Sequence, residues 1–273
     1  MWHRSETKEA TTSPLSPALV PHVPLRMVGM VKVAVFGARG RMGQELCRAI
    51  EAADGLELVA ALDLGDDRDS AADADVAVDF TVPDAVMENL TWCAERGIHA
   101  VVGTTGITAE RLDRIRELYA DGRANAIVAS NYSIGSLLMM KFAEIAAPFF
   151  ESVEIIELHH PNKVDAPSGT AVTTAGRIAA ARAAAGLGET PDATELDPDG
   201  ARGAKVDGIS VHSVRQRGLF ANQEVRFGNE GEQLVITENG FTRASYMPGV
   251  ITAIRAVSTM PGVTVGIEKL LGI

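Results

Sequence analysis

A glycine-rich turn between an apolar run and a helical pattern constrains this fold most strongly. Residues 31–36 are rich in valine and predict a buried strand. Apolar residues recur four apart from Met42, which predicts a helix. The turn between them reads Gly37-Ala38-Arg39-Gly40-Arg41-Met42-Gly43. Its glycines let the backbone approach an anionic group, and the helix N-terminus offers that group free N–H donors. The turn therefore predicts a βα unit that binds a phosphate-bearing ligand.

Strand-like and helix-like segments alternate up to residue 129. We expect strands over 56–62, 76–80, 99–102 and 126–129, and helices over 42–53, 83–96 and 108–120. Residues 64–75 are too short and too acidic for a crossover helix, so we expect a loop there. Because parallel strands need long crossover connections, the alternation predicts an α/β fold with a doubly wound parallel sheet, the Rossmann arrangement.

The pattern changes after residue 133. We expect helices over 134–150 and 168–185, strands over 153–159, 209–215, 221–227 and 233–237, and a loop over 186–208. The last three strands follow one another closely, which favours antiparallel pairing. A helix expected over 243–260 returns the chain to the first domain. We predict a first domain over 30–133 plus 244–273, and a second, α+β domain over 134–243 with a mixed or antiparallel sheet.

The first 29 residues differ from the rest. Four prolines interrupt a Ser/Thr-rich stretch without helical or strand period, which predicts a disordered extension. The stretch has neither the apolar core of a signal peptide nor the arginine-rich composition of a transit peptide. Met27 and Met30 stand just before the first expected strand, so the start of the protein is open between Met1, Met27 and Met30.

The charge balance excludes some classes of partner. The chain has 25 Lys+Arg against 36 Asp+Glu, a net charge of −11, whereas nucleic-acid binding needs a basic face. Its two cysteines, Cys47 and Cys93, cannot build a disulfide framework. No apolar run approaches the ~20 residues of a membrane span. We therefore expect a cytoplasmic protein that binds neither nucleic acid nor membranes.

Two features near the glycine turn indicate a dinucleotide. Asp63 ends the second expected strand, where a carboxylate accepts hydrogen bonds from ribose hydroxyls and favours NADH. Arg39 and Arg41 are able to hold a 2′-phosphate, which favours NADPH. The spacing G-x-x-G-x-x-G is less specific than G-x-G-x-x-G, so a plain glycine turn beside an unrelated Asp63 is the alternative. We predict use of both NADH and NADPH, with less than ~100-fold preference for either.

Two further loops are expected beside this site. Gly103-Thr104-Thr105-Gly106 follows the fourth expected strand, and Ala129-Ser130-Asn131-Tyr132 follows the fifth. In an open parallel sheet, ligands lie beyond the carboxyl ends of the strands. Both loops are therefore candidates for cofactor contacts, with the first near the nicotinamide, and the alternative for each is a simple turn.

The segment from Glu157 to Thr170 holds two histidines, a lysine and the start of a helix. Adjacent histidines on a strand point to opposite sides, and no Cys or third His lies nearby, which disfavours a metal site. A structural role for one histidine stays open. Histidine titrates near neutrality, and a lysine with a helix N-terminus attracts carboxylates. We interpret the segment as a proton donor beside an anion site, with no metal.

This segment resembles the signature of the 4-hydroxy-tetrahydrodipicolinate reductases, or dihydrodipicolinate reductases, of the diaminopimelate and lysine pathway. The common pattern is Glu-Leu-His-His-x-x-Lys-x-Asp-Ala-Pro-Ser-Gly-Thr. The resemblance extends over 31–271 and includes Val-Asp-Phe-Thr at 78–81 and Val-Asp-Gly-Ile-x-Val-His-Ser-Val-Arg at 206–215. It points to the actinobacterial members and does not include the Pro-rich extension.

The resemblance implies a role for each matching residue. His159 is implied as proton donor and Lys163 as second acid, in a reaction on a small dicarboxylate substrate. The implied carboxylate-binding residues are His160, Lys163, Gly169 and Thr170. The implied cofactor-binding residues are Gly37, Ala38, Arg39, Gly40, Arg41, Met42, Asp63, Gly103, Thr104, Thr105, Ala129, Ser130, Asn131 and Tyr132. Family likeness also implies a homotetramer joined through the sheets of the second domain, and closure of the two domains over substrate.

The implied reaction is NADH- or NADPH-dependent reduction of 4-hydroxy-tetrahydrodipicolinate to tetrahydrodipicolinate, with loss of the 4-hydroxyl as water. Two alternatives are a different NAD(P)-dependent dehydrogenase and a non-catalytic module that senses dinucleotides. The first has no reason to carry His-His-x-x-Lys together with Ser-Gly-Thr. The second would lack acids beside the nicotinamide, so His159 and Lys163 disfavour both.

Overall fold

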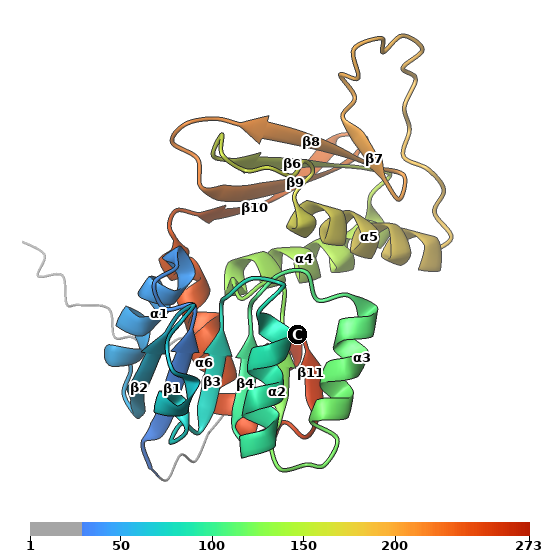
Figure 1. Cartoon of the computed structure of the whole chain (residues 1–273). Coiled ribbons are helices and arrows are strands. Elements are labelled where there is room, and N and C mark those ends of the chain that lie inside the picture. The colour runs from blue at the N-terminus through green and yellow to red at the C-terminus, as the bar shows by residue number, and fades with distance from the viewer. Residues whose placement is uncertain (1–28) are drawn as a thin grey trace, which may run out of the picture.

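The computed structural model describes residues 29–273 and contains two sheets, one above the other in Figure 1. The extension predicted over 1–29 lies outside the described residues except for Gly29, and so do Met1 and Met27. Within 29–273, no helix is both long enough and apolar enough to span a bilayer.

The lower sheet has six strands in the order β11-β5-β4-β3-β1-β2, and all its pairings are parallel. Its strands are β1 (Val31–Phe36), β2 (Leu56–Leu62), β3 (Val76–Asp79), β4 (His99–Val102), β5 (Ala126–Val128) and β11 (Val263–Val265). Because β2 and β3 lie on opposite sides of β1, the strand order reverses beside β1. Ligands bind at such a reversal, at the carboxyl ends of the strands.

Helices cover both faces of this sheet. They are α1 (Arg41–Glu51), α2 (Val86–Arg96), α3 (Ala109–Leu118), α6 (Met247–Ala256) and α7 (Glu268–Leu271), with 3-10 turns η1 (Arg68–Ala71), η3 (Arg243–Tyr246) and η4 (Val257–Thr259). The expected loop over 64–75 contains only η1. The helix expected over 243–260 is divided into η3, α6 and η4. The sequence analysis missed β11 and α7, which are only three and four residues long.

The upper sheet is mixed and has the order β10-β9-β6-β8-β7. Its strands are β6 (Ser152–His159), β7 (Ala204–Val206), β8 (Ile209–Arg215), β9 (Ala221–Asn229) and β10 (Glu232–Gly240). Strands β9 and β10 pair antiparallel as expected, but the expected pairing of β8 with β9 is wrong. Strand β6 lies between them, parallel to β8 and antiparallel to β9. Its Val153 and Ile155 are fully buried, which suits the centre of a sheet better than an edge.

Two helices lie between the sheets in Figure 1, and α4 (Ile134–Ala146) connects the lower sheet to the upper one. Helix α4 continues into the 3-10 turn η2 (Ala147–Phe149), where Pro148 cannot donate to a helical hydrogen bond, so the helix ends before the predicted residue 150. α5 (Gly169–Ala184) lies directly beneath the upper sheet in Figure 1. Residues 186–208, expected to be a loop, also contain the short strand β7.

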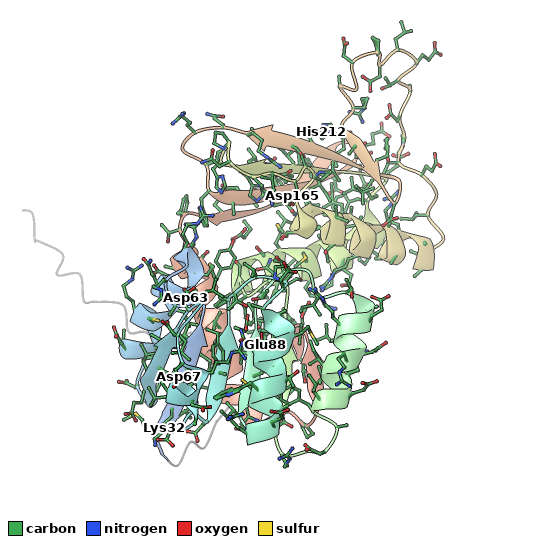
Figure 2. The ribbon with its side chains drawn as sticks, in the orientation of Figure 1. Lys32, Asp63, Asp67, Glu88, Asp165 and His212 are labelled. Atoms are coloured by element: carbon green, nitrogen blue, oxygen red, sulfur yellow. The ribbon has the colours of Figure 1, made fainter. Side chains whose placement is uncertain are left out.

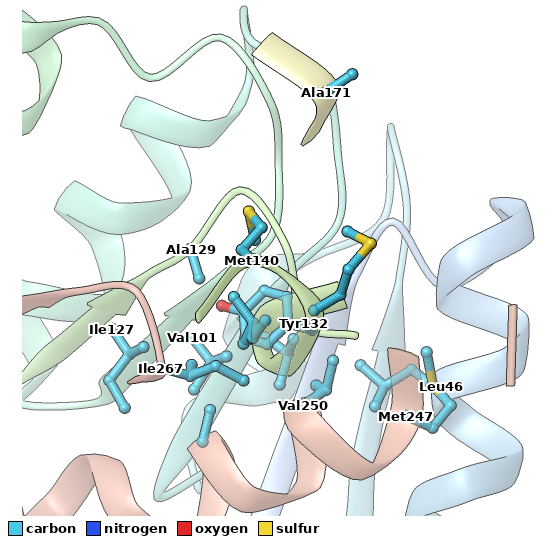
Figure 3. Packing of buried hydrophobic residues seen from close by; sticks show 14 of the residues in the cluster. Leu46, Val101, Ile127, Ala129, Tyr132, Met140, Ala171, Met247, Val250 and Ile267 are labelled. Carbon is cyan, nitrogen blue, oxygen red and sulfur yellow. The ribbon is translucent and has the colours of Figure 1, made fainter. Parts of the chain in front are cut away.

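One apolar core runs through both halves of the molecule. Figure 3 shows part of it, where Met140 of α4 and Val250 of α6 lie near Tyr132, and Leu46 of α1 lies beside Met247 of α6. The same cluster reaches Phe227 in the upper sheet. The parallel sheet beside a mixed sheet confirms the predicted fold class. The domain bounds at 133/134 and 243/244 stay a prediction.

Candidate active site

A cleft of about 830 Å³ gathers residues from both sheets. Twelve predicted site residues line it: Met42, Gly103, Thr105, Ala129, Ser130, Asn131, Tyr132, His159, His160, Lys163, Gly169 and Thr170. Seven others do not: Gly37, Ala38, Arg39, Gly40, Arg41, Asp63 and Thr104. The structure thus brings the acids, the start of α5 and the loops after β4 and β5 together. In Figure 2, Asp63 lies toward the end of the lower sheet that faces the upper one, and Lys32 lies at the opposite end.

The glycine turn leaves room for close approach to the start of α1. Gly37 has φ +82°, and a Cβ there would lie 2.5 Å from the carbonyl oxygen of Phe80. A Cβ at Gly43 would lie 2.1 Å from the carbonyl oxygen of Gly37. Gly40 precedes the first turn of α1, and no side chain caps this end within the described part of the chain. The N–H groups of that turn therefore remain available to an anionic group.

Arg39 and the acidic loop after β2 form a polar cluster at the same strand ends. The backbone N–H of Arg39 donates to Asp63 Oδ2 over 2.9 Å. The guanidinium of Arg39 lies beside the next carboxylate, with Nη1 3.0 Å from Asp66 Oδ2. The Asp63 N–H donates to Asp66 Oδ2 over 2.8 Å. Hydrogen bonds from the Asp63 N–H and from Arg39 lower the pKa of Asp66. An anionic carboxylate thus already occupies one side of the Arg39 guanidinium.

Buried Asp79 holds the loop that carries Thr104. Its Oδ1 accepts hydrogen bonds from Thr81 Oγ1 over 2.7 Å and from Thr104 Oγ1 over 2.6 Å. Its Oδ2 accepts one from Asn89 Nδ2 over 2.7 Å. The Gly103 N–H donates to the Asp79 carbonyl oxygen over 3.0 Å. Thr104 therefore supports the loop after β4 from behind, while Gly103 and Thr105 line the cleft.

We expect Asp79→Ala to lower the free energy of unfolding by about 2–4 kcal/mol, because it leaves several buried donors without an acceptor. Urea unfolding measures the change. Asp84→Ala, at an exposed position in the loop before α2, is the matched control and should change stability by less than ~0.5 kcal/mol. An Asp79→Ala protein as stable as the Asp84→Ala protein would contradict this role.

His159 ends β6 and is held by a buried carboxylate. Its Nδ1 lies 2.6 Å from Glu157 Oε2, and Glu157 is fully buried. Burial lowers the pKa of His159, although the neighbouring Glu157 carboxylate opposes this shift. Because Nδ1 faces Glu157, Nε2 is the nitrogen left for a ligand in the cleft.

Lys163 and the start of α5 form the positive side of the site. Lys163 Nζ donates to Asp165 Oδ1 over 2.7 Å and lowers the pKa of that carboxyl. Ser168 caps α5 by accepting a hydrogen bond from the Ala171 N–H, so Gly169 and Thr170 begin the helix. Their N–H groups have no partner within the helix. A carboxylate that binds here meets an ammonium group and a helix N-terminus together.

Several residues in or behind the cleft were not predicted from the sequence as site residues. Arg215 of β8 makes a two-pronged pair with Glu157, with both N–O distances 2.8 Å. Phe220 and Arg243 line the cleft, and the Arg243 guanidinium lies 5.4 Å from the Phe220 ring centroid. The family pattern at 206–215 includes Arg215, but only the β6–β8 pairing shows that it meets Glu157. Within residues 29–273, no group of three or more His, Cys, Asp or Glu side chains is placed to hold a metal ion.

Comparison with known proteins gives a consistent result. Family models for the N-terminus and the C-terminus of dihydrodipicolinate reductase match residues 31–132 and 135–271. The chain is 60% identical to the 4-hydroxy-tetrahydrodipicolinate reductase of Cutibacterium acnes, over 89% of this chain and 100% of the relative. It is 55% identical to that of Nocardia farcinica, over 88% and 98%. Both organisms are actinobacteria, as predicted.

Solved structures extend the likeness to three dimensions. The dipicolinate-bound dihydrodipicolinate reductase of Paenisporosarcina sp. TG-14 superposes with a TM-score of 0.77 at 38% identity, over 88% of this chain and 99% of that one. GenD2 from gentamicin A biosynthesis, at 14% identity and a TM-score of 0.54 over 85% and 87%, shows the fold alone. The predicted reductase activity in lysine and diaminopimelate biosynthesis is confirmed by these relatives. The chain belongs to the dihydrodipicolinate reductase family.

Proposed function

We propose that this chain carries out its family's reaction in the cleft between the sheets, with His159 and Lys163 as its acids. The observation that carries the proposal is that both acids line the same cleft as the loops after β4 and β5, at the carboxyl ends of the parallel strands. A bound dinucleotide and a substrate at the start of α5 would meet there.

The chain's own residues supply the substrate site. The N–H groups of Gly169 and Thr170 and the ammonium group of Lys163 would bind one carboxylate of the dicarboxylate, and His160 lies beside them in the cleft. His160 Nδ1 is buried without a hydrogen-bond partner among the described residues. The related Paenisporosarcina enzyme is solved with dipicolinate, a dicarboxylate of the same size class, which supports this assignment.

The reaction needs one hydride and one proton. The 4-hydroxyl would first leave as water together with a hydrogen of C3, which gives a C3–C4 double bond conjugated with the imine. NADH or NADPH, when bound, would supply hydride to C4 of that bond. The electron pair would then move to C3 and the imine, and His159 or Lys163 would donate the proton that C3 takes up. Holding the dicarboxylate by its charged groups before transfer places the reacting atoms together.

The residues around β1 and β2 fit a dinucleotide. The pyrophosphate would lie at the start of α1, where a Cβ at Gly37 or Gly43 would strike backbone atoms. Asp63 would accept hydrogen bonds from the ribose hydroxyls, and Arg39 with Arg41 would contact a 2′-phosphate. We propose that both NADH and NADPH serve, with less than ~100-fold preference for either.

Asp66 is expected to limit the use of NADPH. Its carboxylate is fixed by the Asp63 N–H and neutralises Arg39, so a 2′-phosphate must compete with it. We expect Asp66→Asn to lower KM for NADPH by about 3–10-fold and to change KM for NADH less than twofold. Steady-state kinetics with each cofactor measures both. Asp73→Asn, at an exposed acid of the same loop, is the control. Equal effects on the two cofactors would contradict this role.

We also propose a homotetramer that assembles through the upper sheets. Apolar side chains stay exposed on β10 and on the α4–η2 segment, namely Leu234, Val235, Phe142, Ile145 and Phe149. Exposed apolar side chains favour association with other copies. Sedimentation equilibrium should give the mass of four chains, and a monomer would contradict the proposal.

Cofactor oxidation followed at 340 nm tests the proposed function. With freshly made product of dihydrodipicolinate synthase, we expect turnover with NADH and with NADPH. Omitting the synthase or its substrates should abolish the signal. No oxidation with either cofactor would overturn the proposal.

A further inference from the structure

Glu157 is a fully buried carboxylate that does not line the cleft. Its Oε2 lies 2.6 Å from His159 Nδ1 and 2.8 Å from Arg215 Nη1. Its Oε1 lies 2.8 Å from Arg215 Nη2 and accepts the Ser168 N–H over 3.2 Å. A carboxylate removed from water this completely needs such partners to remain charged. Two of these three residues, His159 and Ser168, belong to the segment 157–170, and the third, Arg215, also contacts Asp165 of that segment.

We propose that Glu157 is the positioning residue of this site: it fixes the tautomer of His159 and ties the catalytic loop to the strand that carries the acid. This inference rests on the proposed function of His159 and Lys163. It assigns Glu157 an effect on catalysis through other groups and no contact with the reacting atoms.

The first effect of Glu157 is on the position of the His159 proton. Burial by itself would raise the pKa of Glu157, but hydrogen bonds from Arg215, Ser213 and His159 outweigh burial and lower it. Glu157 is therefore ionised at neutral pH and can only accept hydrogen bonds. His159 Nδ1 must then carry its proton in both charge states. The ring releases its second proton from Nε2 and needs no rotation between turnovers.

The second effect of Glu157 is on the loop that carries Lys163. Arg215 Nη2, already paired with Glu157, also donates to the Asp165 carbonyl oxygen over 2.7 Å. The Ser168 N–H bond to Glu157 fixes the end of the same loop, at the cap of α5. Strand β6, which carries His159, is thereby linked to the loop at two points that follow Lys163. One carboxylate sets the separation of the two acids and of the carboxylate-binding helix end.

Glu157→Gln tests the proposal because it preserves shape and removes charge. Only one of the two terminal atoms of glutamine can accept hydrogen bonds, so one pair of donors loses its acceptor. Strand β6 offers a matched control in Glu154, which pairs in the same way with His212 Nε2 over 2.8 Å and with Arg202, outside the cleft. Glu154→Gln should leave kcat within about twofold of the wild type.

We expect Glu157→Gln to lower kcat by about 10²-fold. The substitution should raise KM for substrate by a smaller factor than the one by which it lowers kcat. The pH profile adds a readout that a structural role alone would not move. A general acid must be protonated, so kcat falls as the pH rises through its pKa. The charged groups that face His159 are Glu157 on its own strand, Lys163 on the loop and Arg215 on β8. Without the Glu157 charge, the imidazolium is less stable and this fall should move about one pH unit lower.

Nitrogen NMR of histidine-labelled protein gives a readout that does not depend on turnover. Wild-type His159 should carry its proton on Nδ1 when neutral, and Glu157→Gln should shift that population toward Nε2. A wild-type protein with neutral His159 protonated on Nε2 would overturn the inference, whether or not the variant folds. A folded Glu157→Gln protein with wild-type kcat and pH profile would overturn it too. Failure of the wild type to oxidise either cofactor would instead refute the proposed function.

Discussion

Lys163→Ala is expected to lower kcat by more than ~10-fold, toward the 10²–10⁴ that a general acid contributes. The substitution removes an ammonium group that lines the cleft and lies 2.7 Å from Asp165. Asp165 is half-exposed, with 52% of its side chain accessible, so breaking the pair should change stability by less than ~1 kcal/mol. Steady-state kinetics and thermal unfolding separate the two effects.

Lys141→Ala is the matched control for Lys163→Ala. Lys141 pairs with Glu144 on α4 and does not line the cleft, so its loss should leave kcat unchanged. Wild-type turnover by a folded Lys163→Ala protein would remove Lys163 from the catalytic assignment.

Gly43→Ala is expected to weaken dinucleotide binding by more than ~10-fold and to lower stability by about 1–3 kcal/mol. The added Cβ would lie 2.1 Å from the Gly37 carbonyl oxygen and 2.7 Å from the Ala38 Cα. Both atoms belong to the backbone, so the start of α1 must move away from the turn. Because the turn and that helix end together form the proposed pyrophosphate site, the movement should act directly on dinucleotide binding. Quenching of protein fluorescence by NADH measures the affinity.

Gly188→Ala provides the comparison for Gly43→Ala. A Cβ at Gly188 meets no atom within 4 Å, and this residue lies outside the cleft. The Gly188→Ala protein should bind NADH with the affinity of the wild type. Equal affinity of the Gly43→Ala and wild-type proteins would contradict the assigned role of the turn.

The parallel half of the fold was predictable because its signals are local. A valine-rich run, a glycine turn and a helix with apolar residues four apart together specify a βα unit, and the structure has β1 and α1 in that place. The elements missed there, β11 and α7, have too few residues to show a period. Strand β11 pairs with β5, which is far away in the sequence.

The pairing in the upper sheet was less predictable because it depends on contacts distant in sequence. Strands β8 and β9 follow each other closely, yet β6 separates them in space. The same insertion explains why Glu157 and Arg215 were not recognised as partners. Register pairs Glu157 with Ser213 of β8, which brings Arg215, two residues on along the same face, within reach of the carboxylate.

The candidate acids could be named from the sequence because they lie within one short segment, but their environment could not. The pattern around His159 and Lys163 predicts a proton donor beside an anion site. It does not show that His159 meets a buried carboxylate or that Lys163 pairs with Asp165. The residues of each pair stand only two apart in the chain, but the burial of Glu157 and its hydrogen bond from the Ser168 N–H depend on how the loop after β6 folds back.

Transfer of deuterium from the cofactor tests the central claim most directly. With cofactor deuterated at nicotinamide C4 and fresh product of dihydrodipicolinate synthase, the wild type should place deuterium at C4 of tetrahydrodipicolinate. The label should reach that position from NADH and from NADPH, and more than ~10-fold more slowly in Lys163→Ala. Oxidation of the cofactor without deuterium at C4, or no oxidation at all, would contradict the account.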